Sequence, residues 1–159
     1  MNTAYVALGA NLGDPLATLR LAVEALHALP DSRTLGVSSF YRTAPVGLRN
    51  QPDFINAVAS LQTGLTPAAL LDALFAVEGQ FGRVRSIRNA PRTLDLDLLM
   101  HGAHVSDDPY LTLPHPRMHL RAFVLAPLAE IAPALMVPGH GPVRTLLEQC
   151  AGQHIERLP

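Results

Sequence analysis

The sequence contains no lysine, and all twelve of its basic residues are arginine. A lysine Schiff base and a P-loop lysine are therefore excluded, so any bound phosphate must be held by arginine, backbone amides or a metal. Tryptophan is also absent and phenylalanine occurs only five times, so side chains that could stack on a flat ligand are scarce. The single cysteine, Cys150, excludes an intrachain disulfide and a cysteine-rich zinc site, which suits a reducing compartment.

The net charge is also low, and long apolar runs are lacking. The net charge of −1 argues against broad electrostatic capture of nucleic acid or of an anionic membrane. The N-terminal residues do not have the pattern of a signal peptide, and no apolar run approaches the length of a membrane span. We therefore expect a cytoplasmic protein that acts on small molecules, with one domain over residues 1–159. We also expect a monomer, although the sequence itself leaves the oligomeric state open.

Hydrophobic periodicity predicts a regular series of strands and helices. Residues 4–8, 34–43, 54–63 and those from 93 onward have the short apolar runs or the alternation typical of strands. Two helices each begin with a capping residue and a proline, at Asp14–Pro15 and at Thr66–Pro67. This β-α-β-β-α-β order predicts an α+β, ferredoxin-like fold, in which helices pack on an antiparallel sheet. A C-terminal extension with helices over 121–131 and 143–150 could cover the other face or an edge of that sheet.

The stretch from Gly82 to Gly102, GRVRSIRNAPRTLDLDLLMHG, combines basic and acidic residues. Its first half carries the arginines Arg83, Arg85, Arg88 and Arg92. In its second half, Asp95 and Asp97 fall on one face of the predicted strand, with Cα atoms about 6.7 Å apart. Such neighbouring carboxylates on a partly buried face are costly unless a cation lies between them. One or two Mg²⁺ ions would suit them, because hard divalent cations bind carboxylate oxygens and complete their shells with water and phosphate.

Other interpretations of these residues stay open at this point. The aspartates could be exposed strand residues, and the arginines could belong to an ordinary solvated loop. Glu78 is interpreted most simply as a surface carboxylate paired with arginine. His115 and His119 have the spacing of a shared metal site on a helix, but Pro116 allows a helix to begin only there and no third ligand is near. A single histidine between two prolines is better suited to donating a hydrogen bond to a ligand.

Metal-assisted phosphoryl transfer is the chemistry that the aspartates and arginines favour, because it needs metals that bridge phosphate oxygens and cations that take up charge. Two other classes of function share part of the pattern. A nucleotidyltransferase also uses Asp-x-Asp on a strand, but it would need a third carboxylate and a basic template surface. A ligand-sensing module would bind a small metabolite without catalysis, and Mg²⁺-independent binding would favour it.

Several segments carry a family resemblance that covers essentially the whole chain. They are, in order, ALGANLGDP, SSFYRTAPVG, QPDFINAV, GRVR, APRTLDLDLL and LPHPRMHLRAFVLAPLAEIAP. Together they resemble the 6-hydroxymethyl-7,8-dihydropterin pyrophosphokinases of folate biosynthesis, and PRTLDLDLL followed by LPHP is highly specific. The resemblance implies that the diphosphoryl group of ATP passes to the hydroxymethyl oxygen of the pterin by attack on the β-phosphorus, with release of AMP.

The resemblance also implies roles for individual residues. It implies catalytic roles for Arg83, Arg92, Asp95 and Asp97, the last two of which would hold two Mg²⁺ ions. Around ATP it places Glu78, Arg85, Arg88, Arg92, Leu98, Thr112, His115 and Arg121, with Leu98 and Thr112 at the adenine. Around the pterin it places Thr43, Pro45, Val46, Phe54, Asn56 and Phe123, with the two phenylalanines sandwiching the ring and Asn56 on its amide edge.

The residues by themselves support the pterin site in part. Phe54 and Asn56 fall on the same face of the predicted strand, as stacking combined with edge recognition requires. Phe54 and Phe123 could equally belong to the core. The chain also departs from some relatives, which have tryptophan in a longer arginine loop where this chain has Asn89, a proline in place of Ala44, and an aromatic in place of Pro116. The first departure puts the contact of that loop with the pterin in doubt, though not the metal site.

Overall fold

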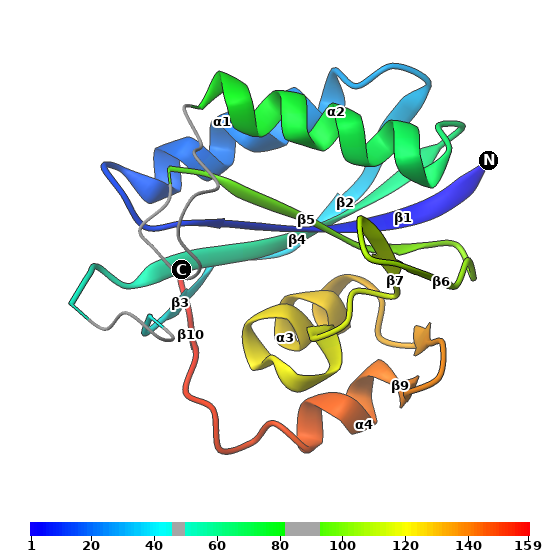
Figure 1. Cartoon of the computed structure of the whole chain (residues 1–159). Coiled ribbons are helices and arrows are strands. Elements are labelled where there is room, and N and C mark those ends of the chain that lie inside the picture. The colour runs from blue at the N-terminus through cyan, green and yellow to red at the C-terminus, as the bar shows by residue number, and fades with distance from the viewer. Residues whose placement is uncertain (46–49, 82–92) are drawn as a thin grey trace.

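A computed structural model describes residues 1–45, 50–81 and 93–159 of the chain. Over these residues the fold consists of a central antiparallel sheet with helices on both faces (Figure 1). The elements are β1 (Asn2–Ala10), α1 (Pro15–His27), β2 (Ser32–Val37), β3 (Tyr41–Thr43), β4 (Phe54–Thr63), α2 (Pro67–Gln80), β5 (Asp95–His101), β6 (Ser106–Asp108), β7 (Leu111–Leu113), the 3₁₀ turn η1 (Met118–Leu120), α3 (Ala122–Ile131), β8 (Met136–Val137), β9 (Gly141–Pro142), α4 (Val143–Glu148) and β10 (Glu156–Arg157).

The central sheet has the strand order β10-β3-β4-β1-β5, and β2 pairs with β4 as well. All of these pairings are antiparallel. The single long strand predicted over residues 34–43 is wrong in one respect, because the structure divides it into β2 and β3. Between them, the hydroxyl of Ser38 accepts a hydrogen bond from the backbone N–H of Val58 at 2.9 Å. A side chain thus replaces a backbone carbonyl in the ladder, which interrupts the strand.

Helices α1 and α2 cover one face of the sheet (Figure 1). Both begin as predicted, because Asp14 accepts a hydrogen bond from the N–H of Ala17 at 3.2 Å and Thr66 accepts one from Ala69 at 3.1 Å. Proline occupies the first turn of each helix. The core beneath them includes Leu19, Leu26, Leu70, Leu74 and Val77 from the helices and Val6, Leu8, Leu61, Leu96 and Leu98 from the sheet.

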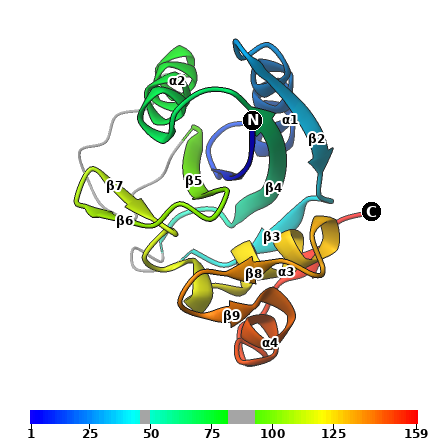
Figure 2. The ribbon, with the colours of Figure 1, turned by 90° about the vertical axis from the view of Figure 1, so that its right-hand side faces the viewer.

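The C-terminal extension covers the opposite face of the sheet (Figures 1 and 2). A second core forms there, and it includes Val58, Leu99, Met100, Val124, Leu125, Leu128, Val143 and Leu146. The end of the extension also reaches the sheet edge, where β10 pairs with β3. The predicted α+β class, antiparallel sheet and C-terminal extension are therefore confirmed, whereas the narrower ferredoxin-like assignment stays a prediction.

Two short hairpins were not predicted from the sequence. Strands β6 and β7 form one of them, and β8 and β9 form the other. Strands of three and two residues are too short to produce a recognisable alternation of apolar and polar residues. Among the helices of the described residues, none has both the length and the apolar character needed to cross a membrane.

Candidate active site

Strand register brings the chemically distinctive side chains together on the face of the sheet that α3 covers. Gly9 of β1 is the register partner of Asp95 on one side and of Asn56 on the other, and Ala7 is the partner of Asp97. Residues that are directly opposite in a sheet project from the same face. The carboxylates of β5 and the amide of β4 therefore share a face, and between them β1 contributes no side chain larger than a methyl group.

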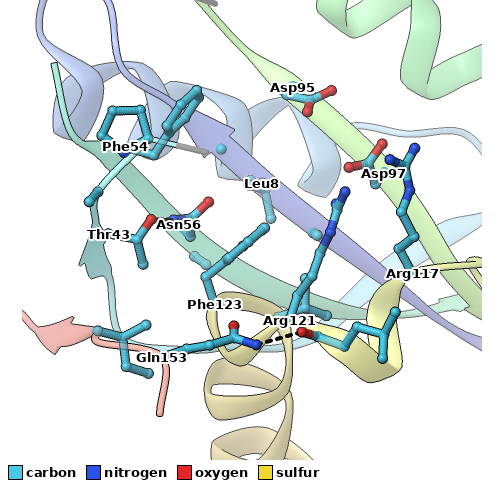
Figure 3. Close-up of a pocket in the computed structure, with 18 of the residues that line it drawn as sticks. Leu8, Thr43, Phe54, Asn56, Asp95, Asp97, Arg117, Arg121, Phe123 and Gln153 are labelled. Carbon is cyan, nitrogen blue, oxygen red and sulfur yellow. Dashed lines mark hydrogen bonds between the residues drawn. The ribbon is translucent and has the colours of Figure 1, made fainter. Parts of the chain in front are cut away.

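A cavity of about 780 Å³ lies between this part of the sheet and the first turn of α3 (Figure 3). This volume falls within the range typical of small-molecule sites, about 300–1,000 Å³. Of the residues predicted for the site, those that line the cavity are Thr43, Pro45, Phe54, Asn56, Asp95, Asp97, His115, Arg121 and Phe123.

Asp95 and Asp97 project from β5 at one end of the cavity (Figure 3). Both side chains are half-buried, whereas Leu96 and Leu98 face the core under the helices, so the predicted alternation is confirmed. Within the described residues, no group of three or more His, Cys, Asp or Glu side chains is placed to hold a metal ion. Water and phosphate could complete the shell of an ion on these two carboxylates. This donor set suits Mg²⁺ and does not suit a zinc site closed by protein ligands.

The turn after β7 contributes His115 and Arg117 to the cavity, and the start of α3 contributes Arg121. Burial, with a smaller effect from the Arg121 guanidinium, lowers the pKa of His115 to about 4, while Asp95 acts in the opposite direction. The imidazole is therefore neutral near pH 7. Its Nδ1 accepts a hydrogen bond from the backbone N–H of Arg117 at 3.2 Å, so the ring hydrogen lies on Nε2. His115 can thus donate a hydrogen bond to an anionic ligand at neutral pH.

The other end of the cavity combines aromatic rings with a buried amide (Figure 3). The Asn56 side chain is buried, and its Nδ2 donates to the Thr43 hydroxyl at 2.9 Å, which fixes the orientation of the amide. Phe54 is half-buried and belongs to neither core. Phe123 packs partly against the second core and also lines the cavity. The interpretation of Phe54 as a core residue is therefore wrong, and Phe123 contributes to both.

Glu78 is not the surface carboxylate that the sequence suggested. Its side chain is only 2% exposed, and it accepts a hydrogen bond from the backbone N–H of Leu96 at 2.7 Å. Position 78 lies four residues after buried Leu74, so it continues the inward face of α2. Because Leu96 lies between Asp95 and Asp97, Glu78 anchors the segment of β5 that presents both carboxylates.

The two residues that were predicted to lie at the adenine do not line this cavity. Leu98 lies in the core beneath the helices, and the Thr112 hydroxyl on β7 donates to the backbone carbonyl of Asp108 at 3.0 Å. Glu78 does not line the cavity either, because it is a buried residue of α2, which covers the other face of the sheet. The predicted residues Val46, Arg83, Arg85, Arg88 and Arg92 lie outside the described residues, and so do Gly82 and Asn89.

Sequence reasoning missed several residues that line the cavity. They include Gly9, Arg117, Leu120, Gln153, His154 and Ile155. A signal for Gly9 existed, because glycine in an apolar strand often marks a close approach of a ligand or another chain segment. No local pattern distinguishes residues 153–155, since only the path of the chain after α4 brings them to the cavity.

Comparison with known proteins places the chain in a family. A family profile described as 7,8-dihydro-6-hydroxymethylpterin-pyrophosphokinase (HPPK) matches residues 5–133. The chain is 48% identical over 155 residues to the 2-amino-4-hydroxy-6-hydroxymethyldihydropteridine pyrophosphokinase of Pseudomonas aeruginosa, covering 98% of this chain and 96% of that protein. It is 43% identical over 158 residues to the protein of the same name from Haemophilus influenzae, covering 99% of each.

Solved structures share the fold. Wild-type HPPK-DHPS of Plasmodium falciparum superposes with a TM-score of 0.71 at 13% sequence identity, over 93% of this chain and 44% of that one. The chain thus spans less than half the length of that protein, and the likeness concerns the fold alone. The family match and the relatives that align over nearly their whole length show that the chain belongs to the 7,8-dihydro-6-hydroxymethylpterin-pyrophosphokinase family.

Proposed function

We propose that this chain transfers the diphosphoryl group of ATP to the hydroxymethyl oxygen of 6-hydroxymethyl-7,8-dihydropterin and releases AMP, as a step of folate biosynthesis. The observation that carries the proposal is that one cavity has two ends of different chemistry. Asp95, Asp97 and Arg121 line one end, and Phe54 and Asn56 line the other. A polyphosphate needs the first kind of surface and a flat, hydrogen-bonding heterocycle needs the second.

The pterin would bind at the end that holds the amide and the aromatic rings. Asn56 is held by its bond to Thr43, so its carbonyl oxygen is oriented before the ligand arrives. Phe54 and Phe123 come from different elements, β4 and α3, and could lie against the two faces of a ring. The backbone of Pro45 supplies further surface. Preorganised contacts of this kind position the attacking hydroxymethyl oxygen at the boundary with the phosphate end.

ATP would bind at the end that holds the carboxylates and the cations. Arg121 and neutral His115 can donate hydrogen bonds to phosphate oxygens. Asp95 and Asp97 would hold two Mg²⁺ ions, which when bound neutralise phosphate charge and favour in-line displacement at the β-phosphorus. Asp95 and Asp97 are kept at the cavity wall by β5, which Glu78 anchors from below.

The predicted roles of the arginine-rich segment remain part of the proposal. Arg83 and Arg92 would stabilise the transferring group, and Arg85 and Arg88 would contact ATP. Val46 would contact the pterin, and Leu98 and Thr112 would lie near the adenine by family resemblance. We further propose that the chain is one domain, monomeric and cytoplasmic, and sedimentation analysis of the purified protein tests the monomer.

A product assay tests the proposed reaction. Purified protein is mixed with ATP, MgCl₂ and 6-hydroxymethyl-7,8-dihydropterin, and the adenine nucleotides are separated by chromatography. We expect one AMP for each pterin consumed and no product when Mg²⁺ is chelated. Formation of ADP would show transfer of a single phosphoryl group and would refute the proposal, as would turnover that is unaffected by the chelator.

A further inference from the structure

The segment that follows α4 forms part of the cavity wall. Gln153, His154 and Ile155 line the cavity, although they lie beyond residues 5–133, which the family profile matches. Their position comes from the path of the chain, which leaves α4, passes the start of α3 and joins the sheet edge as β10 (Figure 1). The tail is therefore a candidate for a role in the site that the family match does not assign.

Gln153 makes a pair of hydrogen bonds to the backbone at the start of α3. Its Oε1 accepts from the N–H of Ala122 at 2.9 Å. Its Nε2 donates to the carbonyl of Leu120 at 2.7 Å, which is the dashed line in Figure 3. The two partners require opposite ends of the amide, so they determine which atom is oxygen and which is nitrogen. The residue between these two partners is Arg121. Gln153 thus holds the peptide groups on both sides of Arg121.

The start of α3 does not supply this support by itself. Ala122 is the first residue of α3, and the first N–H groups of a helix have no partner within the helix, so the N–H of Ala122 takes its acceptor from Gln153. The Arg121 side chain enters the cavity, and its Cζ lies 5.4 Å from the centre of the Phe123 ring. A shift of this first turn would move Arg121 and Phe123 together.

The tail is in turn fixed to the wall on the pterin side. Arg157 of β10 is the register partner of Tyr41 in β3, and the N–H of Leu158 donates to the carbonyl of Phe40 at 2.8 Å. Strand β3 ends at Thr43, which accepts the hydrogen bond from Asn56. Residues 153–158 therefore connect α3 with the edge strand that orients the pterin-binding amide.

We propose that Gln153 is a positioning residue that acts through Arg121, so that the C-terminal tail contributes to the affinity for ATP. The inference rests on the proposed function, in which Arg121 contacts the phosphates of ATP. Both hydrogen bonds of Gln153 go to the backbone, at Leu120 of η1 and Ala122 of α3, so its effect on ATP through Arg121 is indirect. Gln153 is an exposed residue, so we expect a moderate effect.

A double-mutant cycle tests the inference. The dissociation constant of Mg²⁺-ATP is measured by calorimetry for the wild type, Gln153→Met, Arg121→Met and the double variant. Loss of the two hydrogen bonds in Gln153→Met should raise this constant about three- to tenfold. The same change should have no effect in the Arg121→Met background, because the group that Gln153 positions is then missing. Gln149→Met, at the exposed end of α4, is the matched control and should bind like the wild type.

Each outcome distinguishes a positioning role from a structural one. If Gln153→Met lowers the melting temperature but leaves the dissociation constant unchanged, Gln153 only stabilises the fold and the inference is wrong. Equal losses in both Arg121 backgrounds would also refute it. If Gln153→Met does not fold, Gln153→Asn replaces it, because the shorter amide cannot reach both partners. A wild type that fails to bind Mg²⁺-ATP would refute the proposed function and this inference with it. If the wild type binds Mg²⁺-ATP, the variants test the role of Gln153 separately from the proposed function.

Discussion

Replacing Gly9 with alanine should separate ligand binding from stability. Gly9 lies on β1 between Asp95 and Asn56, and it lines the cavity. A Cβ atom built at this position would lie 3.1 Å from Oδ1 of Asn56. This is closer than ordinary van der Waals contact, so the amide must move by a few tenths of an ångström. The added methyl group would also project into the space between the two ends of the cavity.

The expected stability change is small because two effects oppose each other. Alanine in a strand is more favourable than glycine by about 0.5–1 kcal/mol, since glycine loses more backbone entropy on folding. Displacing Asn56 weakens its hydrogen bond to Thr43, and such a bond contributes about 0.5–1.5 kcal/mol. The free energy of unfolding should therefore change by less than about 1 kcal/mol in either direction. Misalignment of one or two hydrogen bonds to the pterin should raise its dissociation constant about tenfold.

Two measurements on the same protein check this prediction. Calorimetric titration with the pterin, in the presence of Mg²⁺ and a non-hydrolysable ATP analogue, gives the dissociation constant, and denaturant unfolding gives the stability. Gly36→Ala is the matched control, because a Cβ there would lie 3.5 Å from the Ser60 hydroxyl, in ordinary contact, on strand β2. Unchanged pterin affinity in Gly9→Ala, or an equal loss in Gly36→Ala, would refute the assignment of this end of the cavity.

Three further perturbations test other parts of the site. Asp97→Asn should weaken Mg²⁺-dependent ATP binding by about tenfold or more, because a neutral amide is a much weaker ligand for the ion than a carboxylate. Glu78→Ala should lower the free energy of unfolding by about 1–3 kcal/mol, because the buried N–H of Leu96 loses its acceptor, whereas Glu78→Gln should cost less. The pKa of His115 is lowered to about 4, from 6.5, so the folded state resists its protonation and stability should fall as the pH drops from 6.5 towards 4. The contribution of His115 to that loss should be at most about 3 kcal/mol, measured as the difference between the unfolding curves of the wild type and His115→Gln over this pH range.

Each of these three predictions can be checked by a control or by an outcome that would contradict it. Asp72→Asn, an exposed carboxylate on α2, should bind Mg²⁺-ATP like the wild type, and an unaffected Asp97→Asn would place the metal elsewhere. Equal destabilisation by Glu78→Ala and Glu78→Gln would show that the bond to Leu96 does not anchor β5. Parallel stability curves for the wild type and His115→Gln would contradict a buried, neutral imidazole.

Much of the fold could be predicted from local patterns. The helix starts at Asp14 and Thr66 were predicted because a capping oxygen and a following proline act within a single turn. The alternation in β4 and β5 was equally predictable from the sequence, since side chains on a strand change face at each residue. The break at Ser38 was not predictable, because the Ser38 hydroxyl takes the place of a backbone carbonyl as the acceptor for an N–H that lies twenty residues away in the sequence.

Local patterns likewise predicted only part of the candidate site. The aspartates on β5, the aromatic and amide positions on β4, and the histidine between two prolines were all predicted, and the structure places them in one cavity. Glu78 was misinterpreted because the sequence does not show that the backbone N–H of Leu96 lies beside the buried face of α2 and provides a partner for a buried carboxylate. Arg117 and Gln153 were missed because each reaches the cavity through the path of a loop or tail, which has no periodic signal.

The order of the main helices and long strands, and the alternation that places Asp95 and Asp97 opposite the core, were thus determined by the sequence alone, because they depend on neighbours within a few residues. The tertiary structure decided that Gly9 lies between Asp95 and Asn56, that Glu78 holds β5 from below, and that Gln153 supports Arg121. These contacts join segments that are far apart in the chain. They follow from strand register and from the packing of the extension on the sheet, which are properties of the whole fold.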